Sequence, residues 1–146
     1  MFKPKIKDQR SKFKGLVNYK IIMIADEIQI SALITDWSKI PVETVAAGIE
    51  RQMIIGQNMM MCRFRFAPFV VTPEHTHPHE QMTLVVKGKV KFMIDGLAHI
   101  LSPGDVMHFP PHNRHGATML DEEVILIDIF SPIREDFLKI AETRTK

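Results

Sequence analysis

The sequence contains a single cysteine, Cys62, and few other features of secreted or membrane proteins. One cysteine excludes an internal disulfide framework and a zinc site built from cysteines. Long apolar runs are also missing, because none approaches the roughly 20 residues that a bilayer-spanning helix needs. We therefore expect no membrane partner.

A secretory signal is also missing from the start of the chain. Residues 1–14 (MFKPKIKDQRSKFK) are basic, but no apolar core with a small-residue cleavage site follows them. Because a disulfide framework is also excluded, we expect the reducing setting of the cytoplasm.

The chain has no large excess of positive or negative charge, because its formal net charge is +2. The charges are unevenly distributed along the sequence. Residues 1–20 contain seven basic residues and one acidic residue, a net +6, so the rest of the chain carries −4. We interpret residues 1–20 as a basic, flexible, solvated arm. No aromatic or arginine-rich recognition pattern accompanies it, so we expect no nucleic-acid partner.

What the chain does have is the length and apolar content of one folded domain. Of its 146 residues, 45% are hydrophobic and 25% are charged, which excludes disorder as the overall state. We divide it into the arm, an N-terminal extension over residues 21–40 that packs on the barrel or forms a dimer interface, and a domain over residues 41–146. The extension is apolar but its period is ambiguous. One or two strands are predicted over Ile21–Trp37, and a helix is possible over Ile28–Trp37.

From Gln52 onward, short β-rich runs alternate with turn residues. The strongest hairpin signal is Asp95-Gly96 between two such runs. Turns at intervals of roughly 8–12 residues are typical of a sandwich or a small barrel. Strands are predicted over Met53–Ile55, Asn58–Phe66, Met82–Val86, Lys89–Ile94, Ala98–Leu101, Val106–Phe109, Gly116–Met119 and Glu122–Phe130. The fold class is therefore all-β, with a short terminal helix predicted over Arg134–Ala141.

The densest group of residues able to do chemistry lies in residues 74–82, EHTHPHEQM. His75 and His77 are two residues apart, so on an extended segment both imidazoles project from one face. Gln81 follows at an even offset, and His115 comes just after a Pro-Pro turn. Three neutral imidazoles and one amide oxygen leave open positions on a divalent transition metal such as Zn, Mn, Fe or Ni. The sequence predicts one such ion per chain.

The other histidines are expected to matter less. His99, His108 and His112 are interpreted as ordinary surface or strand residues. For His79 two interpretations stay open, a residue lining the mouth of the site and a solvated loop residue.

The order of these residues resembles the two-part signature of the cupin superfamily. The matching positions are His75-x-His77-x3-Gln81-x6-Gly88, followed by Gly104-x5-Pro110 and His115. The resemblance covers about residues 40–140. It implies a single jelly-roll β-barrel with an N-terminal extension and a short C-terminal helix.

Four positions depart from the usual cupin pattern. Phe69 and His112 replace glycines, which we expect to alter only turns, and Met119 replaces an Asn that is not a ligand. Gln81 replaces the usual Glu ligand. Because an amide cancels none of the metal's charge, the site should favour an anionic substrate and act as a stronger Lewis acid.

A narrower resemblance is to the small cupins of pectin and alginate breakdown, which linearise 4,5-unsaturated uronates to 5-keto-4-deoxyuronates. It rests on residues 75–81 and on residues 127–138 (IDIFSPIREDFL). Carried over by position, the resemblance implies that Asp128 and Arg134 are catalytic and that Phe130 and Arg134 bind the substrate.

The strand predicted around Asp128 supports a special role for this residue independently of any family. By alternation it shares a face with Val124, Leu126 and Phe130, and the opposite face is apolar as well. A carboxyl buried there is costly unless it is paired or serves a site. Two other interpretations stay open: Asp128 accepts backbone hydrogen bonds at a barrel rim, and Arg134 only opens the terminal helix or pairs with Glu135.

The leading hypothesis is a metal-dependent enzyme that opens the ring of an unsaturated uronate. The metal would polarise a substrate oxygen or a water, Asp128 would move the proton, and Arg134 would hold the substrate carboxylate. The alternatives are a cupin-type dioxygenase, although such sites more often include a carboxylate ligand, and a non-catalytic sugar- or metal-binding cupin. Small cupin barrels commonly pair, so we expect a homodimer in which the apolar residues 21–34 could form the interface.

Overall fold

The computed structural model describes residues 21–24, 27–30 and 32–138. They belong to two units, residues 1–40 and residues 41–146, which are described separately. The basic arm and the end of the expected terminal helix lie outside the described residues. Among the residues that are described, no helix is long and apolar enough to cross a membrane.

The first unit contains a β-hairpin. Strands β1 (Ile21–Ile24) and β2 (Glu27–Ile30) pair antiparallel, and a 3-10 turn, η2 (Trp37–Lys39), follows. Of the one or two strands predicted over Ile21–Trp37, the structure therefore shows two. The helix considered over Ile28–Trp37 is wrong, because the alternating residues of β2 pair with β1 instead.

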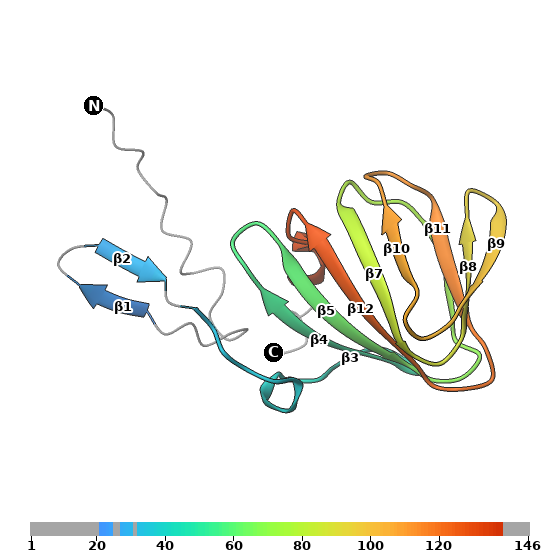
Figure 1. Cartoon of the computed structure of the whole chain (residues 1–146), viewed down its shortest axis with the longest axis horizontal. Coiled ribbons are helices and arrows are strands. Elements are labelled where there is room, and N and C mark those ends of the chain that lie inside the picture. Colours follow the sequence, from blue (N-terminus) through green and yellow to red (C-terminus); the bar gives the residue numbers. More distant parts are fainter. Residues whose placement is uncertain (1–20, 25–26, 31, 139–146) are drawn as a thin grey trace. The chain divides into compact units, whose positions relative to one another are not determined.

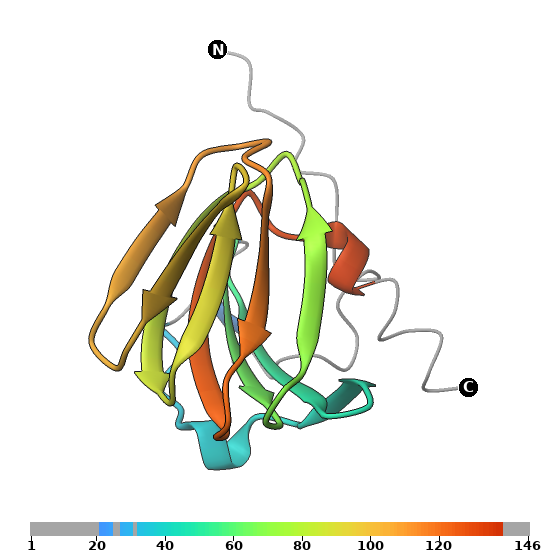
Figure 2. The same cartoon turned by 90° about the vertical axis from the view of Figure 1, so that its right-hand side faces the viewer.

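The second unit is formed by two β-sheets that enclose a core (Figures 1 and 2). The strands are β3 (Glu43–Ala46), β4 (Ile49–Ile55), β5 (Met60–Phe66), β6 (Val71–His75), β7 (Glu80–Lys87), β8 (Val90–Ile94), β9 (Leu97–Leu101), β10 (Val106–Phe109), β11 (His115–Met119) and β12 (Val124–Ser131). One sheet has the order β10-β7-β12-β5-β4-β3 and the other has the order β6-β11-β8-β9. Residues 135–138 are helical. The predicted all-β barrel with a short terminal helix is confirmed.

All eight strands predicted in this unit are present, but β3 and β6 were missed. Both lie at the edge of a sheet, where a strand has only one partner. Strand β6 contains Pro73, which an edge position tolerates because its missing N–H is not needed by a second neighbour. A proline among polar residues therefore concealed the strand that carries His75.

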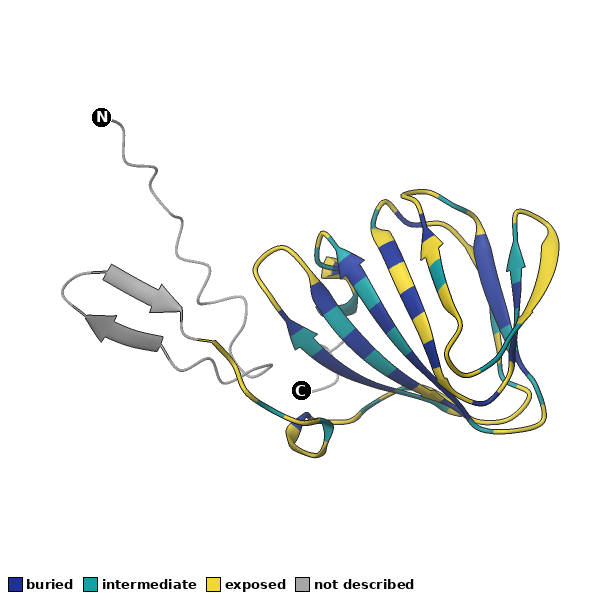
Figure 3. Cartoon of the chain, in the orientation of Figure 1, coloured by how far each residue is buried: buried dark blue, intermediate teal, exposed yellow. Residues whose placement is uncertain are grey.

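Alternation along β7 and β12 determines which side chains enter the barrel. Figure 3 shows the buried and exposed bands along β7, where Gln81 and Thr83 are buried and Met82 between them is exposed. On β12, Asp128 and Phe130 are buried as the alternation predicted. The two strands are neighbours, and Asp128 pairs with Thr83 in register. Two polar inward-facing positions, Thr83 and Asp128, therefore meet inside the barrel.

The hairpin predicted at Asp95-Gly96 is also confirmed. Ile94 pairs with Leu97, so the loop has two residues, and both have positive φ, 49° and 81°. This is the backbone that a type I′ turn requires, and it explains why an Asp-Gly pair occupies the turn.

Phe69 and His112 adopt left-handed backbone conformations, with φ of 63° and 65°. They are the two residues that replace glycines of the cupin pattern, so these turns keep a conformation that glycine favours. The cost for a residue with a Cβ is about 1–2 kcal/mol. Both turns are therefore strained at the residue that replaced glycine.

We expect Phe69→Gly to raise the free energy of unfolding by about 0.5–1 kcal/mol, because relief of strain exceeds the entropy that glycine adds to the unfolded chain. Little packing is lost, since Phe69 is 70% exposed. Denaturant unfolding measures the change. Phe69→Ala is the control, because it removes the ring but keeps the Cβ, and equal stabilisation by both variants would contradict the strain argument.

Candidate metal centre and active site

Three histidines come together where β6 meets β11. His75 pairs with His115 in register, and their ring centroids are 4.7 Å apart. His77 lies in the loop after β6, with its ring centroid 5.2 Å from that of His115. One possible ligand atom from each residue lies within 4.8 Å of the others. The structure therefore brings together all three histidines that the sequence grouped. His75 ends β6, His77 lies in the loop that follows, and His115 begins β11.

Backbone carbonyls hold two of these rings in one tautomer. The Nδ1 atom of His75 lies 3.0 Å from the carbonyl oxygen of Pro73, and Nδ1 of His115 lies 3.0 Å from that of Asn113. A carbonyl oxygen only accepts, so each Nδ1 carries the proton and donates it. Each Nε2 is left with a lone pair, the usual arrangement of histidines that bind metals.

The third ring, His77, is buried and faces Gln81. Its Nε2 lies 3.0 Å from Oε1 of Gln81, and its Nδ1 is buried with no hydrogen-bond partner. Burial, with the charge of Arg134, lowers the pKa of His77 to about 4. Burial also lowers the pKa of His115, against the hydrogen bond to Asn113. Both rings are therefore held neutral, the form that binds a metal.

These donors fit a divalent transition metal. Two ligand atoms that bind one ion at about 2.1 Å each, with an angle of about 90° at the ion, stand about 3 Å apart. The distance between Nε2 of His77 and Oε1 of Gln81 is 3.0 Å, which agrees with this value. Three imidazole nitrogens and one neutral oxygen are acceptable to zinc, nickel, iron or manganese. The four predicted ligands, His75, His77, Gln81 and His115, could therefore hold one ion.

A buried hydrogen-bond chain runs from Gln81 to Asp128. Nε2 of Gln81 donates to Oγ1 of Thr83 at 2.9 Å, and that hydroxyl donates to Oδ1 of Asp128 at 2.6 Å. All three residues are buried. Thr83 was not among the predicted site residues. The signal that could have found it is its place two residues after Gln81 on a strand, which turns both side chains to the same face.

Asp128 has the environment of a functional acid. Burial raises its pKa to about 7, while hydrogen bonds from Thr83 and Gln81 and the charge of Arg134 act in the opposite direction. An acid with a pKa near neutrality can both accept and release a proton at physiological pH. The hydrogen bond to Asp128 comes from a side chain, so the alternative of a rim residue bonded to backbone amides is not supported.

Arg134 immediately precedes the terminal helix and is buried. Its guanidinium lies 5.2 Å from the ring centroid of Phe130, while Nε and Nη2 donate to Asp136 at 3.0 and 2.7 Å. Arg134 therefore pairs with Asp136 and not with Glu135, the partner considered from the sequence. The arrangement brings Arg134 beside Phe130, the two residues for which the resemblance implies substrate binding.

The ring of Phe137 holds Arg134 from another side. Arg134 lies 4.1 Å from its centroid, and Arg51 of β4 lies 4.2 Å from the same centroid. Arg51 is 2% exposed and donates to Glu43 through Nε at 3.2 Å and Nη2 at 2.8 Å. Cation–π contacts of this kind are favourable when they are shielded from water. Sequence reasoning missed this stack, because Arg51 lies far from Arg134 and Phe137 in the chain.

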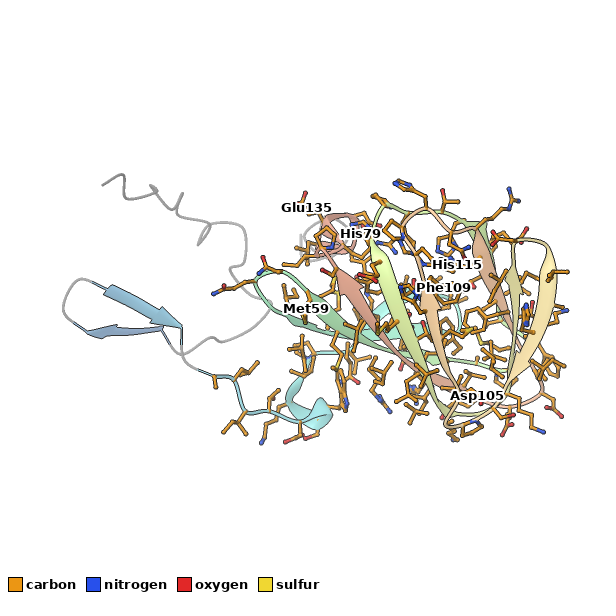
Figure 4. The ribbon with its side chains drawn as sticks, turned by 45° about the horizontal axis from the view of Figure 1, so that its top comes forward. Met59, His79, Asp105, Phe109, His115 and Glu135 are labelled. Carbon is orange, nitrogen blue, oxygen red and sulfur yellow. The ribbon has the colours of Figure 1, made fainter. Side chains whose placement is uncertain are left out.

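His79 stands at the margin of the site. Its ring centroid is 5.6 Å from that of His77, and its Nδ1 is buried with no hydrogen-bond partner. Burial and the charge of Arg134 lower its pKa, against the charge of Asp136. Figure 4 shows His79 and Glu135 on the side of the barrel away from Asp105, with His115 beside Phe109. The interpretation as a residue lining the site is therefore favoured over a solvated loop residue.

The remaining histidines lie outside the group. His99 and His108 are exposed on strands, and Nε2 of His108 lies 2.8 Å from Glu80. His112 is exposed too, but its backbone N–H donates to the carbonyl oxygen of His77 at 2.8 Å. It therefore supports the loop that carries a ligand without offering its own ring.

The two-sheet barrel and the histidine group where β6 meets β11, with His77 and His115 buried and His75 exposed, together define a cupin. The Cupin domain family matches residues 62–130, and the chain belongs to this family. Among its relatives is the pectin degradation protein KdgF of Dickeya dadantii (strain 3937). The two are 36% identical over 100 residues, which cover 67% of this chain and 91% of that protein.

Solved structures agree with this relationship. The structure of KdgF from Halomonas sp. matches with a TM-score of 0.70 and 30% identity, over 73% of this chain and 99% of that chain. An RmlC-like cupin from Shewanella frigidimarina NCIMB 400 matches with a TM-score of 0.69 and 34% identity, over 73% of this chain and 96% of that chain. The narrower resemblance stated from residues 75–81 and 127–138 is confirmed.

Proposed function

We propose that this protein is a metal-dependent enzyme that opens the ring of 4,5-unsaturated uronates to give 5-keto-4-deoxyuronates. The observation that carries the proposal is the meeting of a metal-binding group, the buried acid Asp128 and the buried cation Arg134 around one part of the barrel interior. The similarity to KdgF proteins supports the choice of substrate.

The proposed reaction adds water to the enol ether of the substrate. A proton adds to C4 and the water oxygen bonds to C5, and the resulting hemiketal opens when its hydroxyl proton moves to the ring oxygen as the C5–O bond breaks. A bound divalent metal would polarise a substrate oxygen. Asp128, with a pKa of about 7, transfers the proton. Phe130 packs against the sugar.

Arg134 binds the substrate carboxylate in this proposal. Nε and Nη2 contact Asp136, and no described residue forms a hydrogen bond with Nη1. The outer edge of the guanidinium can therefore receive a carboxylate, while Asp136 and Phe137 hold its plane in place.

The proposal is tested by mixing metal-loaded protein with unsaturated galacturonate, guluronate and mannuronate monomers. The absorbance of the enol ether should disappear as a carbonyl product forms, and metal-stripped protein is the control. Metal-loaded protein that is inert on every uronate would reject ring opening. Oxygen consumption on another substrate would then favour the dioxygenase, and tight sugar binding without turnover would favour the binding protein.

Arg134→Ala should raise the KM for the uronate by about 10- to 100-fold, the effect of losing a charge-assisted hydrogen-bond pair. The metal content should not change, because Arg134 is not a ligand. Steady-state kinetics with elemental analysis measure both. Arg134→Lys keeps the charge but not the planar fork and should recover only part of the affinity. An unchanged KM in both variants would contradict the role of Arg134.

We also propose that the protein is a homodimer. The side chains of residues 21–31, part of the interface suggested by the sequence, lie outside the described ones. On the barrel, β7 and β10 offer a second apolar surface, because Met82, Leu84, Val86 and Val106 are exposed on neighbouring strands. Such a row on a sheet favours self-association.

A further inference from the structure

In the hydrogen-bond chain Gln81–Thr83–Asp128, the acceptor at the Asp128 end determines which group donates at each step. In the structure, the hydroxyl of Thr83 donates to Oδ1 of Asp128 at 2.6 Å, so its single proton is already used. The oxygen of Thr83 must then accept from its other neighbour. The amide of Gln81 therefore turns its N–H2 group to Thr83, which leaves Oε1 facing His77.

We propose that Thr83 is a positioning residue for the metal centre, whose hydroxyl makes the carbonyl oxygen of Gln81, and not its N–H2 group, face the histidines. This inference rests on the proposed metal site. The two ends of an amide have nearly the same shape, so packing alone does not choose between them. An N–H2 group cannot bind a cation, and the hydroxyl therefore decides whether Gln81 can serve as a ligand.

The same chain explains why a glutamine stands where the cupin pattern usually has a glutamate. A carboxylate at position 81 would be a second acceptor beside Thr83, which has one proton to give. Only one of the two buried carboxylates could then receive the proton of Thr83, and two neighbouring buried acids are costly to ionise. When Thr83 donates to Asp128, the amide of Gln81 supplies the N–H that the oxygen of Thr83 accepts.

The first test compares Thr83→Val with Thr83→Ser. Valine keeps the shape of threonine without the hydroxyl, whereas serine keeps the hydroxyl. Zn²⁺ or Ni²⁺ is titrated into metal-free protein, and thermal unfolding shows that each variant is folded. Thr83→Val should raise the dissociation constant about 10- to 100-fold, the usual effect of removing a partner of a metal ligand. Thr83→Ser should remain near wild type.

A Thr83→Val variant that is folded and binds the metal as tightly as wild type would overturn the proposal. This outcome is distinct from a failure of the proposed function. Wild-type protein that binds metal but leaves uronates unchanged would reject ring opening, and the dissociation constants would still decide the role of Thr83. Wild-type protein that binds no metal would reject both.

A second test does not depend on Thr83→Val being folded. Gln81→Glu should lower the thermal midpoint of metal-free protein, because two acids then compete for one hydroxyl proton. Adding Asp128→Asn should restore most of the loss, since the new amide can donate to Thr83, whose proton then goes to the introduced glutamate. Asp128→Asn alone is the control and should change the midpoint little. Additive effects of the two substitutions would overturn the proposed direction of the chain.

Discussion

Protein without bound metal is the expected result of replacing both His75 and His115 with alanine. Purified wild-type protein should contain about one divalent transition metal per chain, because four donors converge on one point. The double variant keeps only His77 and Gln81, and two neutral ligands hold such an ion weakly. Elemental analysis after dialysis measures the difference.

The control for this experiment is His99→Ala with His108→Ala. It removes the same number of imidazoles from exposed strand positions outside the histidine group. Its metal content should equal that of wild type. Full occupancy in the variant lacking His75 and His115 would mean that the ion binds elsewhere, and the metal-dependent mechanism would lose its basis.

Asp128→Asn should lower kcat on the unsaturated uronate by about 10²- to 10⁴-fold, the usual effect of removing a general acid or base. Metal and fold should be kept, because an amide oxygen can still accept the hydrogen bond from Thr83. Kinetics, elemental analysis and a thermal melt on the same preparation separate these effects.

Asp105→Asn is the matched control, since Asp105 is an exposed acid in a turn (Figure 4). It should leave kcat unchanged. An Asp128→Asn variant with full activity would remove Asp128 from the chemistry. If the substitution instead lowered stability and kept turnover, Asp128 would be a structural acid whose buried partners need it.

Most strands could be predicted because they carry alternating apolar residues and end in recognisable turns, as at Asp95-Gly96. Strands β3 and β6 could not, since an edge strand needs neither a continuous apolar face nor a complete set of N–H donors. The helix considered over Ile28–Trp37 failed for a related reason. Pairing between β1 and β2 overrides the weak periodicity of a short apolar segment.

The site divides in the same way. His75, His77 and Gln81 were accessible from the sequence because they are close together in it, and His115 and Asp128 because a family signature and an apolar strand marked them. Thr83 is an ordinary strand residue until the register places it opposite Asp128, 45 residues away. A contact between side chains on two paired strands depends on their register, so the sequence alone does not predict the contact between Thr83 and Asp128.

Under the proposed role of Arg134, the stack on Phe137 connects substrate binding to the edge of the sheet. Arg134 rests on Phe137, which also contacts Arg51, and Arg51 is neutralised by Glu43 on the edge strand β3. A change at Glu43 leaves the buried Arg51 without its carboxylate and disturbs the ring that holds Arg134. Under the same proposal, a substitution on an outlying strand can alter the affinity for the anionic substrate, while every residue proposed to contact the substrate stays the same.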